Sequence, residues 1–121
     1  MKNFIVYRSS AGSGKTYTLA VNYISLAIGG ISFKKDYYKK ILAITFTNKA
    51  AKEMKERILH YLHNLSQQND IDNILSAIKL QTQLSEKLIF KYSKGLYNNI
   101  IHNYSDLGIQ TIDKFTYKIV K

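Results

Sequence analysis

The sequence predicts an α/β fold built on a parallel sheet. Short apolar runs alternate with longer stretches whose apolar residues recur at helical spacing, which is typical of parallel strands joined by crossover helices. The run at residues 41–44 is apolar at every position, as expected for a strand that is covered on both faces. A glycine-containing segment at residues 9–16 connects the first apolar run to the first stretch with helical spacing.

Each element is expected from a local signal. The first helix carries Leu19, Tyr23 and Leu26 at helical spacing and should end at the glycine pair 29–30. The second helix should begin at Thr47 and Asn48, because both residues are good caps. The expected strands lie at about 4–8, 41–46 and 109–112, and the expected helices lie at about 14–28, 48–65, 71–103 and 113–120. Three strands are few against a usual sheet of about five or six, so we expect an incomplete sheet.

The composition fits one domain or part of one. Of the 121 residues, 45% are hydrophobic, which supplies a core, and no apolar run approaches the length of a membrane-spanning helix. The absence of cysteine excludes disulfides and thiolate metal sites. Lysine and arginine number 18 against 8 acidic residues, and the resulting net charge of +10 would attract a polyanion such as nucleic acid. A solvated basic surface is the alternative explanation of this charge.

The segment Ser-Ser-Ala-Gly-Ser-Gly-Lys-Thr at residues 9–16 fits a phosphate-binding loop, with Ser9 in place of the usual first glycine. Backbone N–H groups of such a loop face a polyphosphate, while the lysine reaches the terminal phosphates and the threonine hydroxyl ligates Mg²⁺. Tyr17 could stack on an adenine base or simply pack within the helix. A nucleotide-binding loop also argues for a cytoplasmic protein. We therefore expect ATP and Mg²⁺ as cofactors, held by Ser10, Ala11, Gly12, Ser13, Gly14, Lys15, Thr16 and Tyr17, with Thr16 as the metal ligand.

A second polar cluster follows the second predicted strand, at Thr45, Phe46, Thr47 and Asn48. Its hydroxyls and amide can bond to a phosphate at the start of a helix, and Phe46 can stack on an unpaired base. A capped helix with Phe46 in the core explains the same residues equally well. The residues alone leave both interpretations open.

Three segments of the chain, in order and spacing, resemble the first three motifs of superfamily 1 helicases of the UvrD/Rep type. The RecB/AddA branch, the motor subunits of helicase–nucleases that process double-strand breaks, is the most similar. The first segment resembles Ala-Ser-Ala-Gly-Thr-Gly-Lys-Thr, and the second matches Thr-Phe-Thr-Asn-Lys-Ala-Ala in full from Thr45 to Ala51. The third resembles Thr-Ile-Asp-Ser-Phe, with Thr111 and Asp113 matched and Lys114 in place of serine. The second motif is the specific one, because a phosphate loop alone occurs in many families.

The resemblance implies a P-loop NTPase (RecA-like) fold with a parallel sheet that is incomplete, and a helical insertion between the second and third strands. Residues 1–121 would form the N-terminal part of the first motor domain, with the insertion at about 66–105. The resemblance further implies an ATP-dependent DNA helicase/exonuclease of recombinational repair. Its partners would be single- and double-stranded DNA and a nuclease subunit, with no membrane. The residues implied to contact single-stranded DNA are Thr45, Phe46, Thr47, Asn48, Thr111 and Asp113.

Two features depart from the family's pattern. Asp113 stands where many relatives have histidine, and an anionic side chain would repel phosphate, so it could instead cap the following helix. No run of four apolar residues followed by Asp-Glu occurs, although that acidic motif binds Mg²⁺ and positions the attacking water. We therefore expect this chain alone to bind ATP with little hydrolysis, and Lys15 is its only expected catalytic residue. The alternative is a stand-alone nucleotide-dependent DNA-binding module without turnover.

Overall fold

Three strands form one parallel sheet in the order β1-β2-β3. The computed structural model describes residues 3–6, 14–31, 34, 36–69, 71–104 and 107–111. Strand β1 (Asn3–Val6) pairs with β2 (Ile41–Thr45), and β2 pairs on its other side with β3 (Ile109–Thr111). The central strand β2 is buried along its whole length, as its continuous apolar sequence predicts. The parallel sheet predicted from the sequence is therefore present in the described residues.

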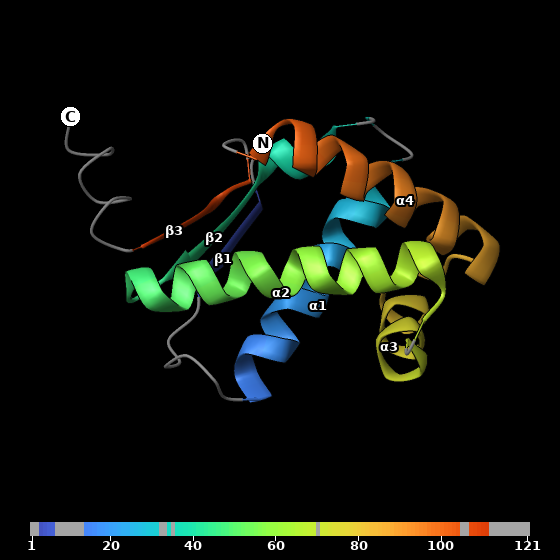
Figure 1. Cartoon of the computed structure of the whole chain (residues 1–121), viewed down its shortest axis with the longest axis horizontal. Helices are drawn as coiled ribbons and strands as arrows, with labels where there is room; N and C mark the ends of the chain where they lie inside the picture. The colour runs from blue at the N-terminus through green and yellow to red at the C-terminus, as the bar shows by residue number, and fades with distance from the viewer. Residues whose placement is uncertain are drawn as a thin grey trace.

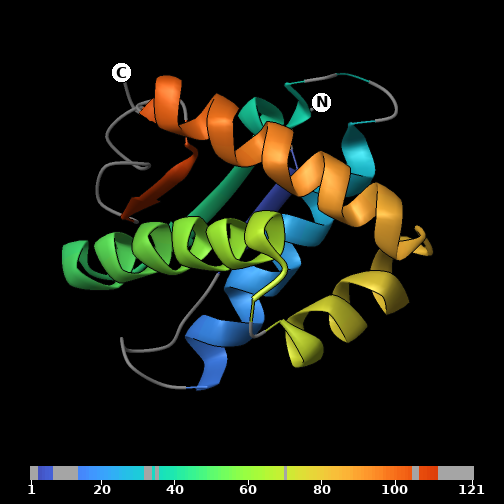
Figure 2. The same ribbon diagram turned by 45° about the vertical axis from the view of Figure 1, so that its right-hand side comes forward.

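The strands are connected through helices, as parallel pairing requires. Helix α1 (Gly14–Gly30) follows β1, and a short 3₁₀ helix η1 (Tyr37–Lys40) leads into β2. Three helices then separate β2 from β3: α2 (Asn48–Gln67), α3 (Asp72–Thr82) and α4 (Glu86–His102). Both views place α4 on one side of α2 and the N-terminal end of α1 on the other (Figures 1 and 2). The predicted helix at 113–120 lies outside the described residues.

The core lies between the sheet and the helices, and α2 is its central helix. Helix α2 packs against α4, α1 and β3, while α1 also packs against α3. The predicted apolar stripe of α2 is buried, and its members are Ala51, Met54, Ile58, Leu62 and Leu65. Burial of this stripe against several elements at once stabilises the arrangement through the apolar area removed from water.

The predicted helical stretch at 71–103 is divided in two. Gln83 adopts a left-handed conformation with φ 61°, which ends α3, and the Ser85 side chain accepts a hydrogen bond from the N–H of Leu88, which caps α4. The buried stripe of α4 consists of Ile89, Ser93, Leu96 and Ile100. Helical spacing in this stretch predicts an apolar stripe of Leu84, Leu88, Tyr92 and Leu96; Leu96 is buried, whereas the other three side chains are half-buried.

Tyr23 connects α1 to the segment before β2. Its ring is fully buried, and its hydroxyl donates a hydrogen bond to the carbonyl oxygen of Tyr38, 3.3 Å away. Burial raises the pKa of Tyr23 well above its usual range, because the phenolate cannot be solvated there.

Within the described residues, no helix is both long and apolar enough to cross a membrane.

Candidate nucleotide and DNA site

The N-terminal end of α1 carries the second half of the predicted phosphate loop. Gly14, Lys15 and Thr16 form the first turn of this 17-residue helix, and the turn contains no acidic residue. Free backbone N–H groups and the positive end of the helix dipole favour an anion at such a terminus. Ser10, Ala11, Gly12 and Ser13, which complete the predicted loop, lie outside the described residues.

The carboxyl ends of the strands bring the predicted segments to one edge of the sheet. Val6, at the end of β1, is the register partner of Ile44 in β2, and Thr45 is the partner of Thr111 in β3. The connection from β1 to α1 and the cluster after β2 therefore leave the sheet at the same edge. Ligands of open α/β sheets bind at the carboxyl edge. The register thus places the end of β1, after which the predicted nucleotide segment follows in the sequence, beside the strand end that leads to the predicted DNA segment.

The cluster after β2 consists of buried hydroxyls and an exposed aromatic ring. Thr45 and Thr111 are only 3% and 5% exposed, whereas Phe46 is 45% exposed. The Thr45 hydroxyl donates to the carbonyl oxygen of Thr47 over 3.2 Å, and the Thr47 hydroxyl accepts from the N–H of Ala50 over 3.0 Å. The helix is therefore capped by Thr47, as predicted, and Phe46 does not lie in the core. Asn48 is exposed at the first position of α2, and Asp113 lies outside the described residues.

Tyr17 packs against α2. Its ring meets the ring of Tyr61 edge to face, with centroids 5.8 Å apart and an interplanar angle of 72°. The Tyr61 hydroxyl accepts a hydrogen bond from Nη1 of Arg57 over 3.2 Å, and Nε of Arg57 lies 3.6 Å from Oε1 of Glu53. These residues adjoin an open cavity of about 410 Å³ on α2, lined by Glu53, Glu56, Arg57, His60 and Tyr61. The sequence left two roles open for Tyr17, stacking on an adenine base or packing within the fold. The contact with Tyr61 shows that Tyr17 packs against α2.

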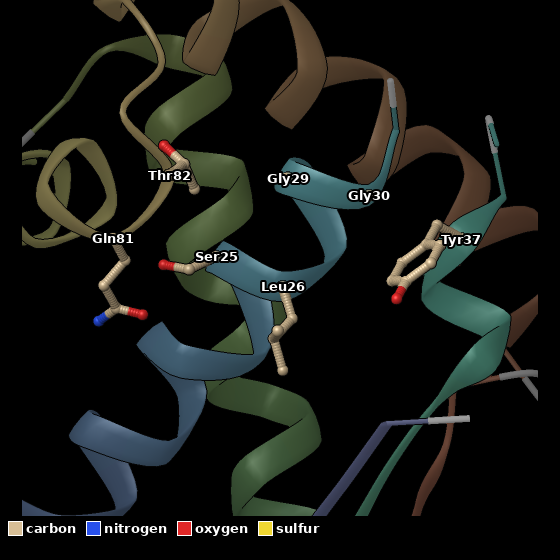
Figure 3. A pocket seen from close by; sticks show the side chains of 7 residues that line it. All are labelled: Ser25, Leu26, Gly29, Gly30, Tyr37, Gln81 and Thr82. Carbon is tan, nitrogen blue, oxygen red and sulfur yellow. The ribbon is translucent and has the colours of Figure 1, made fainter. Parts of the chain in front are cut away.

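A second cavity, of about 270 Å³, lies at the opposite end of α1 (Figure 3). Ser25 lines it, and its buried hydroxyl makes no hydrogen bond within the described residues. Figure 3 shows Gln81 and Thr82 of α3 on one side of Gly29 and Gly30, the last two residues of α1, and Tyr37 on the other side. No sequence signal marks this cavity, because it forms where three separate segments meet.

The two histidines of α2 do not form a metal site with other described residues. His60 and His63 are both exposed; the His60 ring lies 3.3 Å from the amide of Asn64, and the His63 ring lies 5.4 Å from that of Tyr97. Within the described ranges, no group of three or more potential ligands is placed to hold a metal ion.

Comparison with known proteins shows the family to which the chain belongs. The chain matches the family described as "UvrD/REP helicase N-terminal domain" over residues 2–121. It is 31% identical to RecBCD enzyme subunit RecB of Buchnera aphidicola subsp. Baizongia pistaciae over 121 residues, which are 97% of this chain and 10% of that protein. It is 29% identical to an ATP-dependent helicase/nuclease subunit of Lactococcus lactis subsp. cremoris over 120 residues, which are 99% of this chain and 8% of that protein.

The chain therefore spans about a tenth of the length of these relatives. RecBCD enzyme subunit RecB of Borreliella burgdorferi is also similar, with 34% identity over 105 residues, covering 84% of this chain and 9% of that protein. No solved structure matches the chain significantly. The family match covers both predicted segments at the sheet edge and nearly every residue of the chain. The chain belongs to the UvrD/REP helicase N-terminal domain family.

Proposed function

We propose that this chain binds ATP and contacts single-stranded DNA as part of an ATP-dependent DNA helicase of the RecB/AddA kind, acting in recombinational repair. The observation that carries the proposal is the register at the carboxyl edge of the sheet. It puts the end of β1, which leads to the phosphate-loop sequence, beside the cluster that follows β2. An ATP site and a DNA site on adjacent strand ends could influence one another through the sheet. The family membership and the names of the relatives support the same assignment.

In the proposed nucleotide site, the first turn of α1 supplies backbone N–H donors to the phosphates. Lys15 pairs with the terminal phosphates, and the Thr16 hydroxyl ligates Mg²⁺. The remaining loop residues, Ser10, Ala11, Gly12 and Ser13, would contribute to binding the same phosphates. When bound, the metal neutralises charge on the polyphosphate. The Tyr17 ring contacts the Tyr61 ring, so an adenine base that stacks on Tyr17 would also lie beside Tyr61.

In the proposed DNA site, Phe46 is the stacking residue, since its ring is exposed directly after a buried strand. Thr47 and Asn48 are exposed next to it and offer a hydroxyl and an amide to the strand. Thr45 and Thr111 are buried register partners, so we assign them the role of fixing the turn that presents Phe46. Asp113, two residues after Thr111 in the sequence, is the remaining residue that we propose to contact the single strand.

The domain organisation forms part of the proposal. Residues 1–121 would be the N-terminal part of the first motor domain, with an insertion at about 66–105 that contains α3 and α4. The sheet would then be completed by further strands of the motor. Because these 121 residues lack the apolar-Asp-Glu motif, hydrolysis would require residues from elsewhere in the enzyme, which would also work with a nuclease partner.

The Lys15→Ala variant tests the nucleotide site. Loss of a charge-assisted bond worth about 1.5–3 kcal/mol should weaken binding of a fluorescent ATP analogue with Mg²⁺ at least tenfold. Lys39→Ala is the matched control, because Lys39 lies in η1 and pairs with Asp36, 3.8 Å away. The control should bind like the unmodified chain. Equal affinity of the Lys15→Ala variant and the control would contradict the assignment.

A stand-alone nucleotide-dependent DNA-binding module without turnover is the second candidate. The missing acidic motif favours it, because a module that only binds ATP does not need to position a water molecule. An immunoblot of the native polypeptide against residues 1–121 separates the two candidates. A band far above 13.9 kDa supports the motor, whereas a band at 13.9 kDa without ATP-dependent phosphate release supports the module.

A further inference from the structure

The outward face of α4 carries a row of lysines. Lys87, Lys91 and Lys94 are all exposed and follow one another at i, i+4 and i+7, so they occupy one face of the helix. Their Cα atoms lie about 6 Å and then about 4.5 Å apart along the axis, at 1.5 Å per residue. Asn98 and His102 continue the same face toward the end of the helix, and both are exposed. The opposite face is the buried stripe that includes Ile89 and Ile100.

No acidic side chain balances these three lysines in the part of the chain that the structure describes. Glu86, the one acidic residue of α4, pairs with Lys79 of α3, with Nζ and Oε1 3.2 Å apart. The other described ion pairs join Lys39 to Asp36 and Arg57 to Glu53, away from α4. A row of like charges on one helix face is mutually repulsive. The face is therefore built at some cost to stability, and a polyanionic partner would relieve the repulsion.

Gly95 lies at the edge of this face, one turn after Lys91 and one turn before Asn98. A glycine inside a helix costs about 1 kcal/mol relative to alanine, and helix packing often explains its presence. Here the helix is exposed at Gly95, and a Cβ added there would meet no atom within 4 Å. Packing within the described residues therefore does not require this glycine. A glycine beside the lysine row does allow a partner's backbone to approach the helix closely.

We propose that this α4 face, formed by Lys87, Lys91, Lys94, Gly95 and Asn98, binds the phosphate backbone of duplex DNA. The proposal rests on the proposed function in one respect, namely that the polyanion is DNA. Lysines and an asparagine provide donors to phosphate oxygens and carry no base specificity by themselves. The face would hold a duplex at a place separate from the nucleotide site, because α2 lies between α4 and the N-terminal end of α1 (Figures 1 and 2).

The chemistry of the face favours duplex DNA over the other polyanions that a basic helix can bind. A single strand is usually held by exposed aromatic rings, and Phe90, Tyr92 and Tyr97 of α4 are partly buried against the core. An anionic membrane surface requires several apolar side chains to insert, and Ile101 is the one large apolar residue of α4 that is exposed. Duplex DNA carries one negative charge per about 1.7 Å of its axis, so several phosphates lie within the roughly 10 Å of helix that the three lysines span.

The triple variant Lys87→Gln, Lys91→Gln and Lys94→Gln tests the proposal. Binding of a blunt-ended duplex is followed by fluorescence anisotropy at several salt concentrations. Loss of three phosphate contacts should lower the slope of log K against log salt by about 2.7 and weaken affinity at least tenfold at low salt. The matched control removes three lysines before β2, at positions 34, 39 and 40, and should change the slope far less. Equal losses in both triple variants, or none in either, would overturn the proposal.

The Gly95→Ala variant is a sharper test, because it should change stability and binding in opposite directions. A Cβ at this position is expected to raise the melting temperature while weakening duplex affinity several-fold. Gly29→Ala is the control, since its Cβ would lie 3.9 Å from Cγ2 of Thr82, an ordinary contact, in another helix. A Gly95→Ala variant with unchanged or stronger duplex affinity would contradict close approach of the DNA backbone.

Two further measurements separate this inference from the proposed function. The triple α4 variant should bind the ATP analogue like the unmodified chain, and the Lys15→Ala variant should bind duplex like the unmodified chain without nucleotide. Normal ATP binding with unchanged duplex binding in the α4 variant would overturn only the α4 face. Binding to anionic vesicles that is stronger than duplex binding, and is lost in the α4 variant, would replace DNA by a membrane surface.

Discussion

Phe46→Ala should separate DNA binding from stability. The Phe46 side chain is 45% exposed, and it stands between a buried strand residue and the residue that caps α2. Full burial of such a side chain contributes about 3 kcal/mol at most, so truncating a ring that is about half exposed should cost roughly 1–1.5 kcal/mol of unfolding free energy. Stacking of an unpaired base on an aromatic ring is worth about 1–3 kcal/mol, which corresponds to a loss of about 5- to 150-fold in affinity.

The assay is the anisotropy of a labelled oligothymidine, measured beside a urea titration of each variant. Phe46→Tyr should retain most of the DNA affinity because it keeps the ring. Phe46→Leu should lose affinity like alanine while keeping most of the stability, because it keeps apolar volume and removes the stacking surface. Unchanged oligothymidine affinity in both the alanine and leucine variants would refute the stacking role. A stability loss above about 4 kcal/mol for alanine would instead show that Phe46 belongs to the core.

Three further predictions concern stability. Thr47→Ala should lower the unfolding free energy by about 1 kcal/mol, since it removes the cap that accepts from Ala50, and a urea midpoint equal to that of the unmodified chain would contradict the cap. Gly108→Ala should cost about 3 kcal/mol in the same titration, because its Cβ would overlap the carbonyl oxygen of Ile41 in the central strand; an unchanged melting temperature would show that the strands can separate there. Burial raises the pKa of Tyr23, so the folded chain keeps a proton that the unfolded chain loses above the usual value of 10.0, and stability should fall by up to about 1.4 kcal/mol per pH unit above pH 10. Tyr23→Phe should reduce this slope, and equal slopes above pH 10 would be inconsistent with a buried neutral phenol.

Most of the described fold could be predicted from local signals. A continuous apolar run predicted β2, and the cap at Thr47 predicted the start of α2 at Asn48. The break at 83–85 was missed, although Ser85 followed by Glu86 is a recognisable helix start. The helical spacing of apolar residues continues across residues 83–85, so this spacing alone gives no sign that the helix is interrupted. The 3₁₀ helix η1 was missed as well, because its charged sequence is equally typical of a loop.

The candidate site could be predicted only in part. Motif spacing identified the residues at the sheet edge, and parallel pairing explains why they lie at one edge. The exposure of Phe46 could not be predicted, since an apolar ring after a strand is buried or exposed according to what packs over it. The contact between Tyr17 and Tyr61 likewise depends on how α1 and α2 cross, which no local pattern encodes.

The most direct test of the nucleotide site is a titration of the isotope-labelled chain with ATP and Mg²⁺, followed through backbone amide resonances. A chain of 13.9 kDa is small enough for each amide to be observed. The phosphate-loop assignment predicts that the largest shifts occur at Gly14, Lys15 and Thr16, and that they are absent in the Lys15→Ala variant. Shifts confined to the cavity on α2 around Arg57 and Tyr61, with no change at the start of α1, would contradict it.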